Sequence, residues 1–299
     1  MQPLTLTGHA DGVKSLAIIP NGQILITASD DGKIKLWELA TGDQLLTLTG
    51  HPYGVKNVAV CPNGTAFVTG GGDGTVKLWS LKTGKLIRTL VTGYSRLDSG
   101  YMPVAITPDG QTIISHSSSY SQTVKLWDLN SGTLKSTLTG HASSVKTFSI
   151  SPTNQILASD GGDFTVRLWQ LETEELIGLL DGHTAEILTL VISPDGQTLV
   201  TGSKDETLRV WNLETQTLQR VFSGHSYAVN SVAISPNNQL LASGGYDSLV
   251  KIRDLHSGKL LHLFSGHSGA VNSVIFSPDN KILASGSEDK TIKLWKLDL

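Results

Sequence analysis

Short runs of alternating apolar and polar residues recur along the whole chain, and Gly, Pro, Asn and Asp separate them. VKSLAII at 13–19, QILITAS at 23–29 and KIKLWEL at 33–39 are three successive examples. Such β-branched runs, spaced roughly 8–12 residues apart and bounded by turn residues, are typical of strands and hairpins rather than helices. The pattern therefore predicts an all-β fold.

The same set of runs returns seven times at a nearly constant spacing. A Gly-His pair introduces most units, and successive pairs are usually 42 residues apart, as between Gly8 and Gly50. The tryptophans keep the same interval, apart from a longer gap between Trp79 and Trp127, and Arg253 stands where a seventh tryptophan is expected. A fixed period of this length is the signature of a repeat architecture. The pairs begin at Gly8, Gly50, Gly140, Gly182, Gly224 and Gly266, with Gly93-Tyr94 in the remaining position.

We expect four antiparallel strands in each unit. One such sheet cannot bury both of its faces, so neighbouring sheets must stack, and a radial array closed on itself leaves only short outer edges exposed. QPLTLTGH at 2–9 matches QLLTLTGH at 44–51, the fourth strand of a unit, and the chain stops just after the third strand of its last unit. The first strand should therefore complete the last blade. We predict one seven-bladed β-propeller domain over residues 1–299, built from four-stranded antiparallel blades.

The spacing from Gly-His to a Trp-Asp-like pair, repeated over essentially the whole chain, resembles the WD-repeat β-propeller family. The defining dipeptide is degenerate, since Trp127-Asp128 has it whereas Trp37-Glu38 does not. The resemblance implies a scaffold for protein–protein interactions. The nearly uniform blades with SPDGQ-like turns also resemble bacterial, especially cyanobacterial, arrays that are joined to kinase or nucleotide-hydrolase domains.

Five units carry a His, a hydroxyl residue, an Asp and a Trp in one register, which resembles the triad of a hydrolase. A catalytic site has no reason to recur around a ring, so we interpret the set as a structural hydrogen-bond chain, as the family resemblance implies. A buried indole N–H needs an acceptor, the hydroxyl can accept it and reach the imidazole, and the carboxylate fixes the other ring nitrogen. The tetrads are His9, Thr27, Asp31, Trp37; His51, Thr69, Asp73, Trp79; His141, Ser159, Asp163, Trp169; His183, Thr201, Asp205, Trp211; and His267, Ser285, Asp289, Trp295.

Two units break this chain. In the sixth, Arg253 replaces tryptophan, and its guanidinium is expected to donate to Ser243 and to pair with Asp247. In the third, Tyr94 replaces His, Ser121 replaces Asp, and six residues are inserted. Either decay or remodelling for a partner can explain the third unit. Its aromatic and basic replacement residues favour remodelling.

Composition limits the other functions. The chain has 23 basic and 26 acidic residues and a formal net charge of -3. It therefore lacks the one-sided basic field that binding to nucleic acids or anionic membranes usually needs. Cys61 is the only cysteine, so no internal disulfide and no Cys-based zinc site can form, and the cytosol is the expected compartment. No apolar run approaches the roughly 20 residues of a membrane span, and the start MQPLTLTGHA is not a signal peptide. We expect a cytoplasmic monomer with no nucleic-acid or membrane partner.

An enzyme or a small-ligand binder is a weaker interpretation. His116, placed in a Ser-rich loop, His256 and His262 stand outside the repeated register, and none has a metal-ligand spacing with a neighbouring carboxylate. A ligand pocket in the central channel should show aromatic residues on the innermost strands, but runs such as VNSVAIS at 229–235 are aliphatic and small. We therefore expect no catalytic residues, no metal and no cofactor.

A protein or peptide partner is expected on the top face, which is the end of the propeller that carries the loop histidines and turn aspartates. All six tyrosines map to these loops, and tyrosine is enriched at interfaces. In the family resembled, partner-binding positions lie three and five residues after the loop His and one before the turn Asp. The expected partner-binding residues, with those of the irregular third unit, are Lys14, Asp30, Lys56, Tyr94, Arg96, Met102, Tyr120, Lys146, Lys204, Tyr246 and Glu288.

One arc of this surface is basic and aromatic, and it predicts an acidic or phosphorylated partner segment, with the irregular third unit as its anchor. The function expected from the sequence is a non-catalytic interaction scaffold in signalling. The alternative is a targeting or regulatory domain of a larger bacterial signalling protein with a kinase or NTPase domain.

Overall fold

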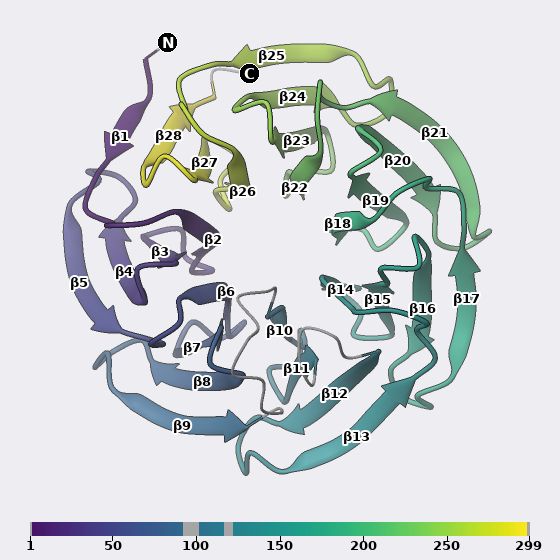
Figure 1. Ribbon diagram of the computed structural model, residues 1–299, viewed down its shortest axis with the longest axis horizontal. Coiled ribbons are helices and arrows are strands. Elements are labelled where there is room, and N and C mark those ends of the chain that lie inside the picture. Colours follow the sequence, from purple (N-terminus) through teal and green to yellow (C-terminus); the bar gives the residue numbers. More distant parts are fainter. Residues whose placement is uncertain (1, 92–101, 117–121, 298–299) are drawn as a thin grey trace.

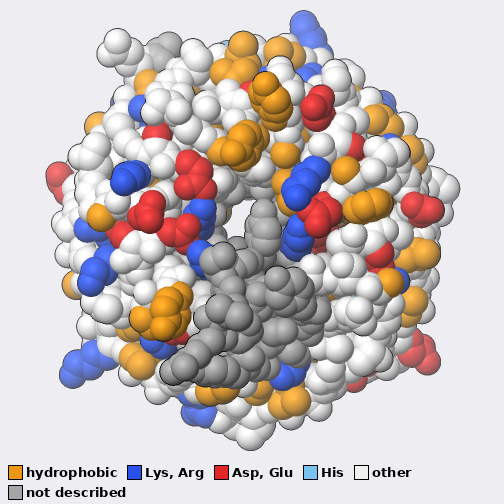
Figure 2. All heavy atoms as spheres, in the orientation of Figure 1, with side chains coloured by type: hydrophobic (Ala, Val, Ile, Leu, Met, Phe, Trp, Pro, Cys, Tyr) orange, Lys and Arg blue, Asp and Glu red, His pale blue; other side chains and the backbone are white. Residues whose placement is uncertain are grey.

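The computed structural model describes residues 2–91, 102–116 and 122–297, and within these ranges every helix or strand is a β-strand. The strands form seven four-stranded antiparallel sheets, arranged radially around a common centre (Figure 1), where the space-filling view shows the opening of a channel (Figure 2). The prediction of an all-β, seven-bladed propeller is confirmed.

Within each sheet the strands follow one another from the channel to the circumference. The innermost strands of blades one to seven are β2 (Val13–Ile18), β6 (Val55–Val60), β10 (Val104–Ile106), β14 (Phe148–Ile150), β18 (Ile187–Ile192), β22 (Val229–Ile234) and β26 (Val271–Phe276). The second strands are β3 (Ile24–Ser29), β7 (Ala66–Gly71), β11 (Thr112–His116), β15 (Ile156–Asp160), β19 (Thr198–Ser203), β23 (Leu240–Gly245) and β27 (Ile282–Ser287). The third strands are β4 (Lys33–Glu38), β8 (Thr75–Ser80), β12 (Thr123–Asp128), β16 (Val166–Gln170), β20 (Thr207–Asn212), β24 (Val250–Asp254) and β28 (Ile292–Lys296). The outermost strands are β5 (Gln44–Thr49), β9 (Leu86–Val91), β13 (Leu134–Thr139), β17 (Leu176–Leu180), β21 (Thr217–Ser223), β25 (Leu260–Phe264) and, in blade seven, β1 (Leu4–Leu6).

The ring is closed by its first strand. β1 pairs antiparallel with β28, and Leu4 lies opposite Leu294 and Leu6 opposite Ile292. β1 is therefore the fourth strand of a sheet whose other three strands come from the opposite end of the chain. The predicted closure of the last blade by the first strand is confirmed.

The hydrophobic core lies between neighbouring blades. Ile26 and Ile34 of blade one, for example, share a buried cluster with Val58, Phe67 and Trp79 of blade two. The Phe67 and Trp79 rings stack with their centroids 6.2 Å apart. Each blade is therefore stabilised by burial against the next one, because a single sheet has no layer of its own to cover it.

A β-bulge at the top of the innermost strand recurs in five blades. In blade one the pairing with β3 shifts between Val13 and Ser15, so Lys14 has no partner residue opposite. A bulge re-aims the side chain of its extra residue. The shift recurs at the corresponding place in blades two, five, six and seven, and its extra residues are Lys14, Lys56, Leu188, Asn230 and Asn272.

Candidate functional site

The predicted hydrogen-bond chain links the second and third strands of a blade, through the turn between them, to the loop before the blade. In blade five, Trp211 Nε1 donates to Thr201 Oγ1 over 3.1 Å, and His183 Nε2 lies 2.7 Å from the same hydroxyl. His183 Nδ1 lies 2.7 Å from Asp205 Oδ2, and Asp205 also accepts from the backbone of Thr184. Blades one, two and seven form the same complete chain. Its histidines are buried and its geometry repeats, which suits a structural role.

Blade four forms the chain in altered form. His141 Nε2 lies 2.7 Å from Ser159 Oγ, but its Nδ1 faces Arg167 Nη1 at 2.8 Å. Asp163 accepts from Arg167 and from the backbone of Ala142. The arginine therefore stands between the imidazole and the carboxylate.

In blade six the expectation for Arg253 is wrong. His225 keeps its contacts with Ser243 and Asp247, but the guanidinium of Arg253 turns away from both. It donates instead to the backbone carbonyls of Gly258 at 3.1 Å and Ser223 at 3.0 Å. An extended arginine reaches the exposed blade edge, where water can solvate its charge, and this avoids the burial that pairing with Asp247 would require.

In five blades the environment of the chain favours a neutral histidine and an ionised aspartate. Burial lowers the pKa of the His9, His183, His225 and His267 side chains below 6.5, and burial together with the Arg167 charge lowers that of His141 to about 4. Burial opposes ionisation of the aspartates, but hydrogen bonds overcome it: those from Thr207 and His183 bring the pKa of Asp205 to about 2. At neutral pH these five histidines are therefore uncharged, and Asp205 is ionised.

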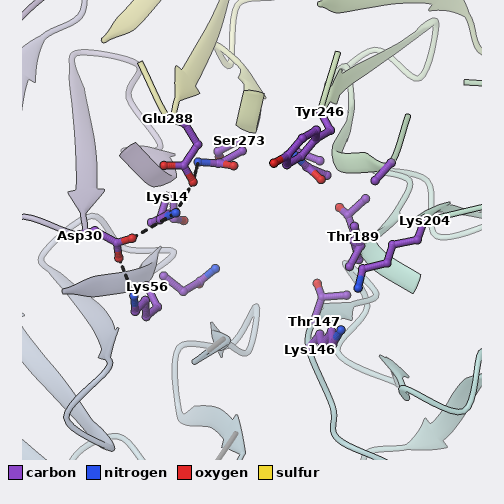
Figure 3. Close-up of a pocket in the computed structure, with 17 residues that line it drawn as sticks. Lys14, Asp30, Lys56, Lys146, Thr147, Thr189, Lys204, Tyr246, Ser273 and Glu288 are labelled. Atoms are coloured by element: carbon purple, nitrogen blue, oxygen red, sulfur yellow. Dashed lines mark hydrogen bonds and ion pairs between the residues drawn. The ribbon is translucent and has the colours of Figure 1, made fainter. Parts of the chain in front are cut away.

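The mouth of the central channel is a separate feature of the top face. It forms a cavity of about 450 Å³ whose wall comes from blades one, two, four, five, six and seven (Figure 3). All five bulge residues lie in its wall, so the bulges explain why charged and amide side chains point into the channel. Below them, hydroxyl residues join the blades: Ser231 Oγ accepts from the backbone N–H of Val274 at 3.0 Å, and Ser273 Oγ accepts from that of Leu16 at 3.1 Å.

Two charge networks line opposite sides of the mouth. On one side Lys14 pairs with Glu288 and, at 3.1 Å, with Asp30, which also accepts from Lys56 at 2.5 Å. Burial opposes the charge of Lys14, but the two carboxylates outweigh it and raise the pKa of its ammonium group. Asn272 donates to Glu288 at 3.1 Å, so a second residue of blade seven joins this network.

On the other side Glu186 is bracketed by two lysines, Lys146 at 2.8 Å and Lys204. Although burial disfavours its ionisation, the hydrogen bonds and charges of the two lysines lower the pKa of Glu186. Figure 2 shows Lys, Arg, Asp and Glu side chains gathered on both sides of the central opening. The arc predicted to be basic is therefore a mixed ring, in which the acidic side chains of blades five and seven meet the lysines of their neighbours.

Exposed tyrosines surround this charged ring. Tyr53 in blade two is 65% exposed, and Tyr227 and Tyr246 in blade six are 60% and 65% exposed. Tyr246 lies in the wall of the mouth, on the side away from Lys14 and Lys56 (Figure 3). Large aromatic side chains left this accessible are a mark of contact surfaces rather than of a folded core.

Seven of the eleven predicted partner-binding residues line the mouth: Lys14, Asp30, Lys56, Lys146, Lys204, Tyr246 and Glu288. The prediction for Met102 is wrong, because its side chain is 3% exposed and packs in the core between blades two and three, with Val68, Val104 and Ile113. Tyr94, Arg96 and Tyr120 lie outside the described residues, so the proposed anchoring role of the third blade stays a prediction.

Two buried polar residues stand at a position that the repeat otherwise gives to small residues. The residue after the tetrad hydroxyl is Ala or Gly in five blades, but it is His116 in blade three and Asp160 in blade four. His116 is the last residue of β11 and fully buried, so its placement in a loop was wrong. Asp160 is also fully buried, and its Oδ1 accepts from the backbone of Lys146 at 2.8 Å and of Thr147 at 2.7 Å. The sequence could have indicated both buried side chains, because each is polar at a position that is Ala or Gly in the other five blades.

Two properties of the described residues bear on other functions. Within 2–91, 102–116 and 122–297 there is no group of three or more His, Cys, Asp or Glu side chains that could hold a metal ion. The same part of the chain holds no helix that is long and apolar enough to cross a membrane.

The fold and the repeated hydrogen-bond chain define a β-propeller built from one recurrent four-stranded unit. The family model described as "WD domain, G-beta repeat" matches the chain in seven places, so the chain belongs to the WD-repeat family. The matches cover residues 2–38, 42–80, 104–128, 132–170, 174–212, 216–254 and 258–296.

Two eukaryotic proteins share parts of this sequence. The chain is similar to "Periodic tryptophan protein 2" of Saccharomyces cerevisiae, with 47% identity over 156 residues, which is 52% of this chain and 16% of that protein. It is similar to human "Ribosome biogenesis protein BOP1", with 50% identity over 40 residues, or 13% of this chain and 5% of that protein. It thus spans only a small part of these longer relatives, and they do not show the expected resemblance to bacterial arrays.

Proposed function

We propose that this propeller is an interaction scaffold that binds a segment of a partner protein across the top face, over the mouth of the channel. The observation that carries the proposal is the arrangement of Tyr53, Tyr227 and Tyr246, all at least 60% exposed, around a polar cavity of about 450 Å³. Interface energy concentrates in a few aromatic and basic side chains at the centre of a contact. An extended segment that crosses the mouth from blade six to blade two meets aromatic contacts at both ends and charge in between.

The charge of the mouth favours an acidic or phosphorylated segment. The two networks hold four lysines, Lys14, Lys56, Lys146 and Lys204, against the three carboxylates of Asp30, Glu186 and Glu288. Because these lysines already make ion pairs within the chain, a partner's anionic groups must share each ammonium group with a carboxylate of this chain. We therefore assign the lysines mainly to steering, so that salt slows association more than it speeds dissociation.

The relatives support a second candidate, in which the propeller is an assembly module in ribosome biogenesis. The names of the BOP1 relatives state that process, and they match over 40 to 42 residues, close to one repeat of this chain. A match of this length would also arise from the structural residues of the repeat alone, without a common function. The interaction role is common to both candidates, and the identity of the captured partner separates them.

Capture from a lysate of the source organism tests the proposal. Tyr227→Ala with Tyr246→Ala should release the partner, whereas Leu45→Ala, which removes a side chain 52% exposed on the outer strand β5, should not. All variants should melt within a few degrees of the parent, because exposed side chains contribute little to stability. Partners that survive the tyrosine substitutions would place the contact elsewhere, and captured pre-ribosomal proteins would favour the second candidate.

A further inference from the structure

The outermost strand of blade four presents an apolar face between acidic ends. Leu176, Ile177 and Leu179 of β17 are between 40 and 53% exposed, although β17 is the edge of its sheet. The segment 170–182 that contains them has no basic residue. Its four acidic residues are all exposed, and they are Glu172, Glu174, Glu175 and Asp181.

The outermost strand of blade two is also apolar on its exposed side, but it carries the opposite charge. Leu86, Ile87 and Val91 of β9 are between 47 and 67% exposed. The segment 80–92 has no acidic residue, and its three basic residues are Lys82, Lys85 and Arg88. In the repeat register Lys82 corresponds to Glu172 and Lys85 to Glu175, because Trp79 corresponds to Trp169.

The remaining described edges lack this combination. β13, β21 and β25 lie in segments that hold both an acidic and a basic residue, and the segment around β1 holds neither among residues 2–8. β5 follows two acidic residues, Glu38 and Asp43, but Leu45 is its only large hydrophobic side chain that is strongly exposed. The two single-sign apolar edges therefore form a complementary pair on one chain.

We propose that two copies of this chain associate side by side, with the β9 edge of one copy against the β17 edge of the other. The edges lie on the circumference, two blades apart, so one molecule cannot bring its own pair together (Figure 1). Exposed apolar side chains supply the contact area, and the opposite charges select the partner edge and orientation. With both top faces on the same side, Lys82 and Lys85 face Glu172 and Glu175.

The contact is made by side chains rather than by a continued sheet. On the β17 edge the carbonyl of Ile177 already accepts from Gln216 Nε2 at 3.1 Å, and on the β9 edge Arg88 donates to the carbonyl of Asn130 at 2.8 Å. Blade five thus occupies part of the β17 backbone, which limits strand-to-strand pairing at this contact. Because the two edges differ, the contact is head-to-tail, and association continues with concentration instead of stopping at a dimer. The top face stays open, so this proposal is independent of the proposed function, and it replaces the expected monomer.

Sedimentation velocity of the purified chain, over a wide concentration range at low and high salt, tests the proposal. The average sedimentation coefficient should rise with concentration at low salt and fall back towards that of the monomer at high salt. Two double variants, Glu172→Lys with Glu175→Lys and Lys82→Glu with Lys85→Glu, should each weaken association by roughly tenfold or more, since like charges then meet. Mixing the two variants should restore it, because each then supplies the edge that the other needs.

Glu38→Lys with Asp43→Lys is the matched control, since it makes the same change of charge beside β5 and should leave association intact. A parent chain that sediments as a monomer at every concentration and salt would overturn the proposal. So would two double variants that associate like the parent, or a mixture that associates no more than its components. Circular dichroism of each variant distinguishes a lost contact from a lost fold, and a misfolded variant is replaced by the corresponding single substitution.

Discussion

The side chain of Asp160 lies against the backbone of Thr147, with Oδ1 2.7 Å from the amide nitrogen. Asp160 is fully buried, and its other carboxylate oxygen has no hydrogen-bond partner. In this blade the innermost strand β14 begins only at Phe148, so the carboxylate caps amide groups just before the strand. Burial outweighs these hydrogen bonds and raises the pKa of Asp160 to about 7.

This pairing predicts a pH-dependent contribution to stability. The folded chain holds a proton on Asp160 that the unfolded chain releases at its ordinary pKa of 3.8, so the contribution is full below that value and is lost as pH rises through about 7. Asp160→Asn cannot ionise and keeps the acceptor oxygen. The free energy of unfolding of the variant should gain on that of the parent by on the order of 1 kcal/mol or more between about pH 5 and about pH 8.

Denaturant titrations of both proteins at these two pH values give the comparison. If the difference between variant and parent is the same at both, Asp160 is ionised throughout and the proposed proton is absent.

The buried histidines predict the opposite trend at acid pH. Since the pKa values of five of them are lowered, the unfolded chain takes up protons below pH 6.5 that the folded chain refuses, and stability is lost as pH falls towards their folded values. As pH falls, the stability lost through these five histidines exceeds the stability gained through Asp160. The free energy of unfolding should therefore decrease from about pH 6.5 to about pH 4. His183→Gln should reduce this slope at the cost of lower stability at neutral pH. A slope unchanged in the variant would show that the pKa of His183 is the same in the folded and the unfolded chain.

The tetrads predict a ranking of two substitutions. Trp211→Ala removes a buried indole and leaves the Thr201 hydroxyl without its donor, so it should cost about 3–5 kcal/mol. Arg253→Trp gives up two bonds to backbone carbonyls but brings an indole to Ser243, so it should stay within about 1 kcal/mol of the parent or stabilise the fold. Thermal melts that place Arg253→Trp below Trp211→Ala would reject the structural role of the tetrads.

The closure predicts that the first strand holds the ring together. Deleting residues 2–9 removes β1 and leaves β28 as an unpaired edge with its apolar side chains uncovered. The truncated chain should melt well below the parent or aggregate through that edge. A synthetic peptide of residues 2–9, added in excess, should recover part of the loss by mass action. Equal melting temperatures for the truncated and parent chains would mean that the pairing of β1 with β28 contributes nothing.

The fold could be predicted because its local signals recur in most of the seven units. The Gly-His interval and the tryptophans give the same count of blades, and the match of 2–9 to 44–51 gives the closure. The hydrogen-bond chains could be predicted for the same reason, because their His, hydroxyl, Asp and Trp residues recur at one fixed spacing.

What sequence could not supply is geometry that depends on a neighbouring blade. Nothing local shows that a bulge aims Lys14 into the channel, or that Lys14 there meets Glu288 from the other end of the chain. Arg253 turned to backbone carbonyls because the blade edge offered solvent, and Met102 fills an inter-blade core instead of facing a partner. These positions were aligned correctly with the repeat, but the surroundings of each side chain come from blades that are distant in sequence.

The most direct test of the top-face scaffold is site-specific photocrosslinking. A photoreactive amino acid at Tyr246 should crosslink to the captured partner in good yield, whereas the same amino acid at Asn21, in the turn at the opposite end of blade one, should not. Mass spectrometry of the Tyr246 crosslink should identify an acidic or phosphorylated segment, as the lysines of the mouth predict. Crosslinking from Asn21 with none from Tyr246 would contradict the account.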